Sequence, residues 1–267
     1  MDFEKSIGLE SVINARELGG YVGENGKMVK SGVLLRTAHL HKLSDNDKQK
    51  LEKEYNVKYV IDFRVDEETT DVPDRLPAGA RYEHINVLAI PDGTMRKVGE
   101  MPTDPMELYR LAKKFGLLDE DLYVKIIESD KGINGYKKFF DILLKAENNE
   151  AVLFHCTSGK DRTGIAAMLI LSVLGVDEKV IVADYVLSND YYAAQRKKTI
   201  AGLLQTGLDR SIIDKILILK DAVDVNFMTT LIAYLKDTYG SVVDFTKKRL
   251  GLTDDDIESL KNKYLER

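Results

Sequence analysis

Residues 151–174 place an apolar strand-like run, a short polar loop and a long apolar run in direct succession. Ala151–Phe154 is predicted to form a short buried strand, and Thr163–Leu174, which is apolar on nearly every face, is predicted to form a buried helix. The chain between them must turn from the strand straight into the first turn of the helix. This arrangement favours an α/β fold and leaves the unpaired N–H groups of a helix N-terminus facing the loop, where they can bind an anion.

The loop reads HCTSGKDRTG from His155 to Gly164 and contains the only cysteine of the chain. Cys156 and Arg162 are separated by five residues, a span short enough to wrap around a tetrahedral dianion. A cysteine nucleophile must be a thiolate, and a helix N-terminus and a guanidinium both stabilise that charged form. Arginine also binds two phosphate oxygens at once. The sequence therefore predicts that Cys156 attacks the phosphorus of a phosphate monoester while Arg162 holds the phosphate.

The other loop residues predicted to bind the substrate are Thr157, Ser158, Gly159, Lys160, Thr163 and Gly164. Gly159 and Gly164 allow the backbone to approach the phosphate closely, and Thr163 is expected to donate a hydrogen bond to the departing sulfur. Lys160 has two open interpretations, a second cation for the substrate or a solvated side chain at the rim. His155 is expected to order the loop by hydrogen bonding, because its side chain should point away from the phosphate.

Two other interpretations of this loop are weaker. A lone cysteine is often inert packing, but Arg162, Lys160 and two glycines surround this one at loop spacing. A glycine-containing turn between a strand and a helix also occurs in nucleotide-binding loops. There the lysine precedes Ser or Thr, which binds magnesium, whereas here Lys160 precedes Asp161.

Cleavage of the ester requires a proton on the leaving oxygen, and two carboxylates are candidates for the general acid. Asp161 lies inside the loop, where Lys160 and Arg162 favour its ionised form, which is a poor proton donor. Asp92 lies in a Pro-Asp-Gly turn after a predicted strand, a position from which an acid can move into the site. Asp92 is therefore preferred, although such a turn is also ordinary turn chemistry.

The loop resembles the HCxxGxxR[ST]G signature of the protein tyrosine phosphatase superfamily, and its GKDR sequence looks like the bacterial tyrosine phosphatase B-type subgroup. Further stretches similar to that subgroup follow in the same order along the chain: NARELGG at 14–20, GVLLRT at 32–37, IDFR at 61–64 and VIVADYVLSND at 180–190. Ala15 replaces an aromatic residue of the subgroup. The resemblance implies activity on phosphoprotein and, in some members, on phosphoinositides. It also implies an aspartate at both candidate positions and a role for Lys160 in tolerating strongly anionic substrates.

Strands are predicted early in the chain, at Val57–Phe63 and Arg81–Leu88, and helices late, at about 177–204, 211–220, 225–239 and 253–264. This order indicates an α/β fold with a largely helical C-terminal half. The resemblance implies a central, mostly parallel sheet flanked by helices, within a single phosphatase domain over 1–267. Residues 93–134 match the subgroup least well. They are expected to form helices, as a lid over the site or as an ordinary packed subdomain.

Composition limits the partners of the chain. The net charge of −5 gives no indication of nucleic-acid binding, and no apolar run reaches the ~20 residues that span a bilayer. The expected partner is a phosphorylated protein or a phosphoinositide, and no motif indicates an oligomeric state. The N-terminal residues lack the pattern of a Sec signal peptide, so a cytoplasmic location, or export by another route, is expected.

Several arginines outside the loop are expected to have structural roles. Arg36 and Arg64 each end an apolar run, and, like Arg16, they are expected to form structural ion pairs more often than to touch substrate. The histidines show no metal-ligand spacing, so no metal site and no cofactor are predicted.

The alternative function is a catalytically silent phosphatase fold that only binds phosphorylated ligands. The presence of Cys156, Arg162 and both candidate acids argues against it. Arsenate reduction is disfavoured because no resolving cysteine is present.

Overall fold

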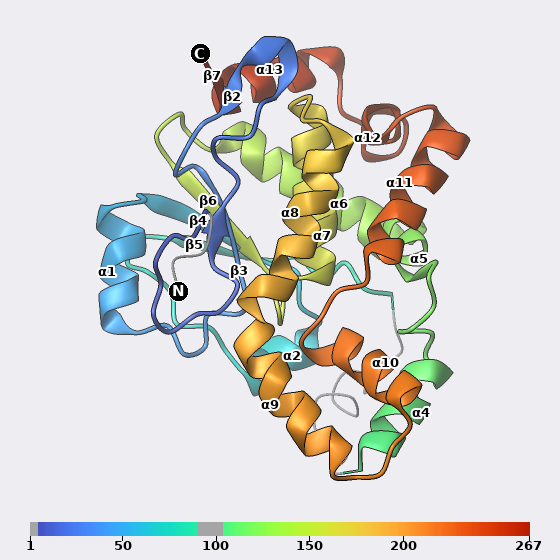
Figure 1. Ribbon diagram of the computed structural model, residues 1–267. Helices are drawn as coiled ribbons and strands as arrows, with labels where there is room; N and C mark the ends of the chain where they lie inside the picture. The colour runs from blue at the N-terminus through green and yellow to red at the C-terminus, as the bar shows by residue number, and fades with distance from the viewer. Residues whose placement is uncertain (1–4, 90–103) are drawn as a thin grey trace.

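The computed structural model describes residues 5–89 and 104–267. Its centre is a five-stranded sheet with the strand order β1-β3-β6-β4-β5 (Figure 1). The strands are β1 (Arg16–Glu17), β3 (Leu34–Thr37), β4 (Val57–Asp62), β5 (Arg81–His84) and β6 (Ala151–His155). All neighbouring pairs run parallel except β1 and β3, which are antiparallel. The expected mostly parallel sheet is confirmed.

The predicted strand before the cysteine loop is the middle strand of this sheet. Strand β6 pairs with β3 on one side and β4 on the other, and every residue of it is buried because apolar cores cover both faces of the sheet. Its last residue, His155, is level with Thr37 of β3 and Asp62 of β4. The loop that begins at Cys156 therefore starts where the carboxyl ends of three parallel strands meet, the usual position of binding sites in α/β sheets.

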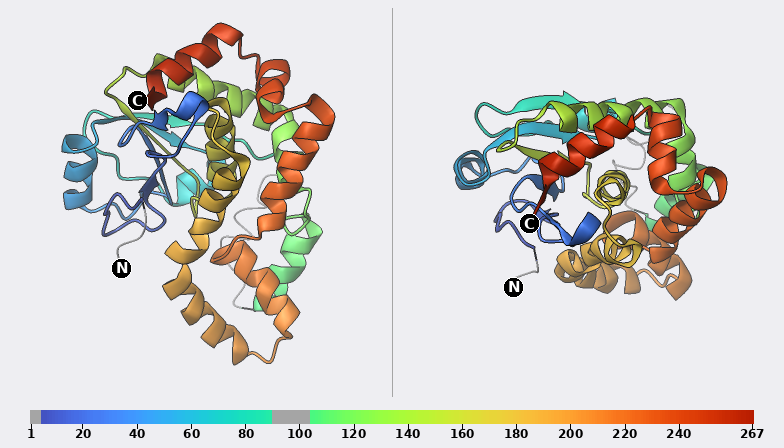
Figure 2. Two further views of the ribbon diagram at one scale, coloured as in Figure 1. Left: turned by 45° about the horizontal axis from the view of Figure 1, so that its top comes forward. Right: turned by 90° about the horizontal axis from the view of Figure 1, so that it is seen from above.

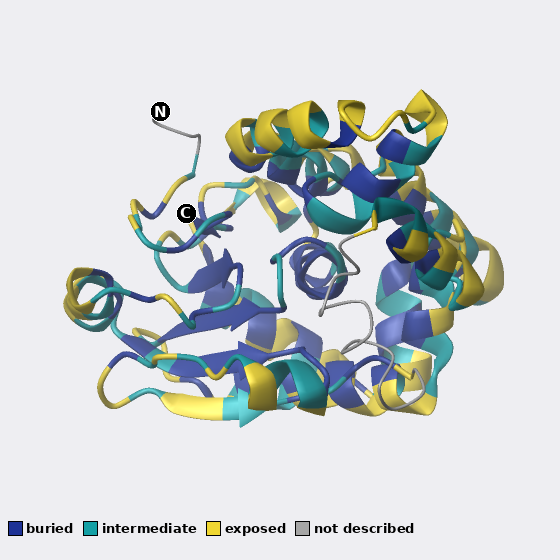
Figure 3. Ribbon diagram, turned by 90° about the horizontal axis from the view of Figure 1, so that it is seen from below, coloured by how far each residue is buried: buried dark blue, intermediate teal, exposed yellow. Residues whose placement is uncertain are grey.

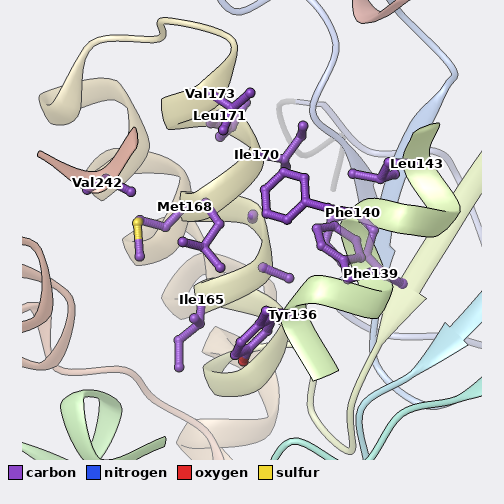
Figure 4. Packing of buried hydrophobic residues seen from close by; sticks show 14 of the residues in the cluster. Tyr136, Phe139, Phe140, Leu143, Ile165, Met168, Ile170, Leu171, Val173 and Val242 are labelled. Carbon is purple, nitrogen blue, oxygen red and sulfur yellow. The ribbon is translucent and has the colours of Figure 1, made fainter. Parts of the chain in front are cut away.

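Helices cover both faces of the sheet. Helix α1 (Asp45–Lys53), begun by the Ser44 cap, packs on one face with the apolar residues of the N-terminal segment. The larger core lies on the other face, where α6 (Asp130–Lys145) and α7 (Asp161–Val173) pack their apolar side chains toward each other (Figure 4). In Figure 3 the central strands are buried, whereas the edge strand β5 is partly exposed.

The C-terminal half is helical, as expected. After α7 follow α8 (Glu178–Tyr191), α9 (Ala193–Leu204), α10 (Arg210–Lys220), α11 (Val225–Tyr239), α12 (Val242–Leu250) and α13 (Asp254–Tyr264). The helix predicted over 177–204 is divided at Tyr192 into α8 and α9. The sequence patterns did not indicate α12, a short helix that begins at the Ser241 cap and has Lys and Arg residues in its last turn. The last residues form β7 (Leu265–Glu266), which pairs with β2 (Met28–Val29) just after the short helical turn η1 (Glu24–Gly26).

The insertion contains helices where the sequence predicted them. Among its described residues, α4 (Pro105–Lys114) begins with Pro105 behind the Asp104 cap, and α5 (Leu122–Glu128) follows. Residues 93–103 lie outside the described part of the chain. The predicted strand over 81–88 is shorter, ending at His84.

Helices α4, α9 and α10 lie together at one end of the molecule (Figures 1 and 2). They share a small apolar cluster separate from the main core, here called the cover cluster, which consists of Leu108, Leu203, Ile213, Ile216 and Leu217. Among the described helices, none combines the length and apolar character needed to cross a membrane.

Candidate active site

The cysteine loop forms one wall of a cavity of about 590 Å³. Cys156, Thr157, Ser158, Asp161 and Arg162 line it, so five of the predicted site residues meet there. The opposite walls come from α2 (Asp66–Asp71) and from apolar residues of the insertion and α10: Leu108, Leu117, Leu122, Ile126, Ile218 and Leu219. The cavity therefore combines a charged base with apolar sides.

The loop carbonyls point away from the cavity because residues outside the loop bind them. The side-chain amide of Asn14 donates to the carbonyls of Ser158 and Gly159, at 3.1 and 3.0 Å. The Tyr192 hydroxyl donates to Ser158 at 2.9 Å, and the N–H of His39 donates to Thr157 at 3.1 Å. Outward carbonyls leave successive N–H groups of the loop on the inner side, the geometry of an anion-binding nest.

Gly159 is required by its surroundings. Its φ of +63° is unfavourable for other residues, and a Cβ there would lie 2.2 Å from the carbonyl oxygen of Thr37. Gly164 also faces protein, with Tyr185 3.0 Å from the position of a Cβ. Neither glycine lines the cavity, so both serve close packing of the loop and α7.

The predicted structural role of two buried arginines is seen directly. Arg16 and Arg36 both pair with Asp184 of α8, at 3.1 and 2.5 Å, and all three side chains are buried. Arg36 also donates to the carbonyl of Gly159 at 2.8 Å. Burial opposes the charge of Asp184, but the two guanidinium groups lower its pKa below the usual range. These ion pairs fix the loop from behind.

Arg162 forms an ion pair with Glu68 of α2, a residue that the sequence patterns did not indicate. Its Nη1 lies 2.6 Å from Oε2 of Glu68 and its Nη2 lies 3.2 Å from Oε1, while Thr157 also donates to this carboxylate. Burial alone would raise the pKa of Glu68, but the charge of Arg162 and these hydrogen bonds lower it to about 2. Glu68 thus holds Arg162 in place at the cavity. It lies in an acidic run with no motif, and no sequence signal distinguishes it from Glu67.

His155 is held on the far side of the loop, as expected. It is fully buried, with Nδ1 3.1 Å from the carbonyl oxygen of Cys156 and Nε2 3.1 Å from Asp74. Burial disfavours the imidazolium, but Asp62 and Asp74 raise the pKa of His155. The histidine and these two carboxylates are close enough to share a metal ion, but Arg64 already pairs with both carboxylates, at 2.7 and 2.8 Å. The guanidinium of Arg64 therefore already binds the two carboxylates that a metal ion would need.

Lys160 is buried, and the interpretation of it as a solvated side chain at the rim is wrong. Its ammonium donates to the carbonyls of Ile218, Lys220 and Ala222, at 3.1, 3.1 and 2.9 Å, because the C-terminal end of α10 packs against the loop. Burial lowers the pKa of Lys160. The ammonium contacts backbone and does not line the cavity, so contact with a substrate would require it to leave these carbonyls.

Of the two candidate acids, the structure describes only Asp161. Asp161 begins α7 and lines the cavity, and its Oδ1 accepts a hydrogen bond from the Tyr123 hydroxyl at 2.5 Å. Asp92 lies outside the described residues, so its role stays a prediction.

The hydroxyl of Thr163 is buried without a hydrogen-bond partner among the described residues. The expected hydrogen bond to the sulfur of Cys156 is therefore not formed in this geometry.

A mostly parallel sheet whose middle strand ends in a cysteine loop, with outward carbonyls and a buried arginine, defines a class of α/β enzymes that bind phosphate esters. Comparison with known proteins agrees. The tyrosine phosphatase family matches residues 7–266, and the chain belongs to this family. It is thus a phosphatase of the protein-tyrosine type.

Three relatives show how far the similarity extends. A Cupriavidus necator protein classed as a tyrosine-protein phosphatase is 26% identical over 97% of this chain and 88% of its own length. A tyrosine-protein phosphatase of Nostoc commune is 32% identical over 63% of this chain, which spans about half (52%) of that relative. The triple specificity protein phosphatase PtpB of Mycobacterium tuberculosis is 25% identical over 83% of this chain and 87% of its own length.

Proposed function

We propose that the chain hydrolyses phosphate monoesters through a phosphocysteine formed on Cys156. The observation that carries this proposal is the joint placement of Cys156 and Arg162 on one cavity wall, at the carboxyl end of β6 and the start of α7. The helix N-terminus, the loop N–H groups and Arg162 all place positive charge where a thiolate and a phosphate would lie. Burial opposes the charge of Arg162, but Glu68 and Cys156 raise its pKa, so the guanidinium is always charged.

The chemistry divides into two displacements. In the first, the sulfur of Cys156 attacks phosphorus, and the leaving oxygen takes a proton from a general acid, for which Asp92 is the preferred candidate. In the second, water attacks phosphorus and the thiolate leaves. Thr157, Ser158 and the loop backbone bind the phosphate oxygens during both steps.

The apolar walls favour substrates whose phosphate is carried by a bulky, largely apolar group. Leu122, Ile126 and Leu219 line the cavity above the charged base, where an aromatic side chain such as that of phosphotyrosine would lie. Phosphoserine, phosphothreonine and phosphoinositides are further candidates, and PtpB is named for triple specificity. For a phosphoinositide, Lys160 would have to exchange its three carbonyl partners for a second phosphate.

The domain assignment is part of the same proposal. Residues 1–267 would act as one phosphatase domain, with the 93–134 insertion covering the cavity as a lid. In its favour, Leu108 of α4 and Leu122 of α5 line the cavity. A lid predicts that phosphate protects this segment from a protease, and equal cleavage with and without phosphate would contradict it.

The test is phosphate release from p-nitrophenyl phosphate between pH 5 and 8 in EDTA, by the wild-type protein and by Cys156→Ser. We expect metal-independent turnover by the wild type and none above background by Cys156→Ser, because a serine hydroxyl is not ionised at this pH. Thermal melting of both proteins controls for folding. Turnover retained by Cys156→Ser would contradict the mechanism. No turnover by folded wild type would favour a silent binding module.

A further inference from the structure

Tyr123 of α5 carries a hydroxyl that the mechanism above does not use. The side chain is 1% exposed, and its ring packs against Phe227 and Tyr185, with centroids 5.3 and 6.1 Å away. Its hydroxyl lies 2.5 Å from Oδ1 of Asp161 and 2.9 Å from the hydroxyl of Tyr185. A buried phenol hydroxyl without partners is costly, so this one is held firmly by both.

The Tyr123 hydroxyl acts as a hydrogen-bond donor in this position. Burial raises the pKa of Tyr123 well above its ordinary value, and the charge of Asp161 and the neighbouring Tyr185 raise it further. The group therefore stays a neutral hydroxyl. A hydroxyl whose hydrogen points at Oδ1 fits an ionised Asp161, which accepts hydrogen bonds on both oxygens. Since the ring packs against Phe227 and Tyr185, the hydrogen bond fixes the orientation of the carboxylate.

We propose that Tyr123 is a positioning residue that sets Asp161 as the base of the second displacement. This inference rests on the proposed phosphocysteine mechanism. Tyr123 donates to Oδ1, and Asp161 lines the cavity with Cys156 and Arg162. Among the contacts of the described residues, Oδ2 is therefore the oxygen that we assign to the attacking water. The water oxygen bonds to phosphorus, the P–S bond breaks with its electron pair going to sulfur, and the water proton passes to Oδ2. No further reactant is needed.

This assignment divides the work between the two candidate acids. Asp161, fixed as a carboxylate, takes a proton in the second step, and Asp92 remains the donor for the first. It also gives the 93–134 insertion a part in positioning the catalytic groups, because Tyr123 is a residue of that insertion.

The test separates the two steps by rapid quench with p-nitrophenyl phosphate, whose leaving group departs without needing a proton. Tyr123→Phe keeps the ring and removes the hydrogen bond. It should retain a burst of one p-nitrophenolate per protein, while the steady-state rate falls about tenfold because the base is misplaced. Phosphocysteine should then dominate at steady state. The matched control, Tyr185→Phe, keeps the bond to Asp161 and should change the rate less than about threefold.

Asp161→Asn tests the same claim without altering the core. It should retain the burst and slow the second step about 100-fold, the usual contribution of a general base. An unchanged steady-state rate in folded Tyr123→Phe, or an Asp161→Asn variant that loses the burst, would overturn the proposal. These results leave the proposed function intact when the wild type turns over. A wild type that forms no phosphocysteine refutes the function and this assignment together.

Discussion

The two sides of the cavity are built differently. The cysteine loop is fixed by hydrogen bonds that Asn14, Arg36 and Tyr192 donate to its carbonyls, and by the ion pair between Arg162 and Glu68. On the other side, Leu108 lines the cavity as a member of the cover cluster, a small apolar group apart from the main core. A preorganised charged base stabilises a transition state without reorganising during the reaction, whereas helices that share only a small apolar cluster open at lower cost. The difference indicates that the loop determines the chemistry and the cover determines which substrates enter.

The largest expected effect comes from the arginine in the loop. Arg162→Lys removes the paired N–H donors toward the phosphate and toward Glu68, so kcat/KM for p-nitrophenyl phosphate should fall about 1000-fold. Arg196→Lys is the matched change on α9, where Arg196 donates to the carbonyls of Asn189 and Asp221. We expect it to change kcat/KM less than about threefold. Similar losses in both variants would remove the distinction between loop and cover.

Substitution of two glycines tests whether the backbone is more crowded in the cysteine loop than between α9 and α10. Gly159→Ala introduces strain at φ +63° and a Cβ 2.2 Å from the Thr37 oxygen, so it should destabilise the protein by about 3–4 kcal/mol. Gly207→Ala, between α9 and α10, has a φ of +71° but nothing within 4 Å of the Cβ. It should cost about 1 kcal/mol. Urea unfolding measures both, and equal costs would show that the loop is not crowded.

The buried ion pair of the loop should contribute more to stability than an exposed ion pair of α10. Glu68→Gln should lower stability by about 3 kcal/mol at pH 7, since it leaves Arg162 without its buried partner. Asp214→Asn breaks the exposed pair with Arg210 on α10 and should cost less than about 0.5 kcal/mol. The pKa of Glu68 is lowered from 4.5 to about 2 on folding.

The sign of the pH dependence follows from that shift. The advantage of the wild type over Glu68→Gln should be complete above pH 4.5, the value for an unpaired glutamate, and shrink as the pH falls toward about 2. Unfolding curves at pH 7, 4 and 3 measure it. A difference that stays constant over this range would show that the ionised form of Glu68 is not what stabilises the fold.

Sequence patterns predicted what depends on local order. The apolar run before Cys156 and the all-round apolar helix after it gave β6 and α7 to within two residues, since both are set by hydrophobic periodicity. Helix α12 was missed because it is short and rich in charge, and the cap at Ser241 is its main signal.

Contacts between distant segments could not be predicted in the same way. Lys160 is adjacent to the predicted catalytic residues, yet its direction depends on where the C-terminal end of α10 lies, 58 to 62 residues away. Glu68 and Tyr123 reach the site only because α2 and α5 fold over the ends of the strands. Such side chains carry no motif, and their roles follow from tertiary packing.

The central claim is that Cys156 becomes the phosphorylated group during turnover. The most direct measurement is an acid quench of the wild-type protein during turnover of p-nitrophenyl phosphate, followed by mass spectrometry of its peptides. The account predicts one added phosphoryl group on the peptide that contains Cys156, and none in Cys156→Ser. A phosphoryl group on another residue, or turnover with no labelled peptide at any quench time, would contradict it.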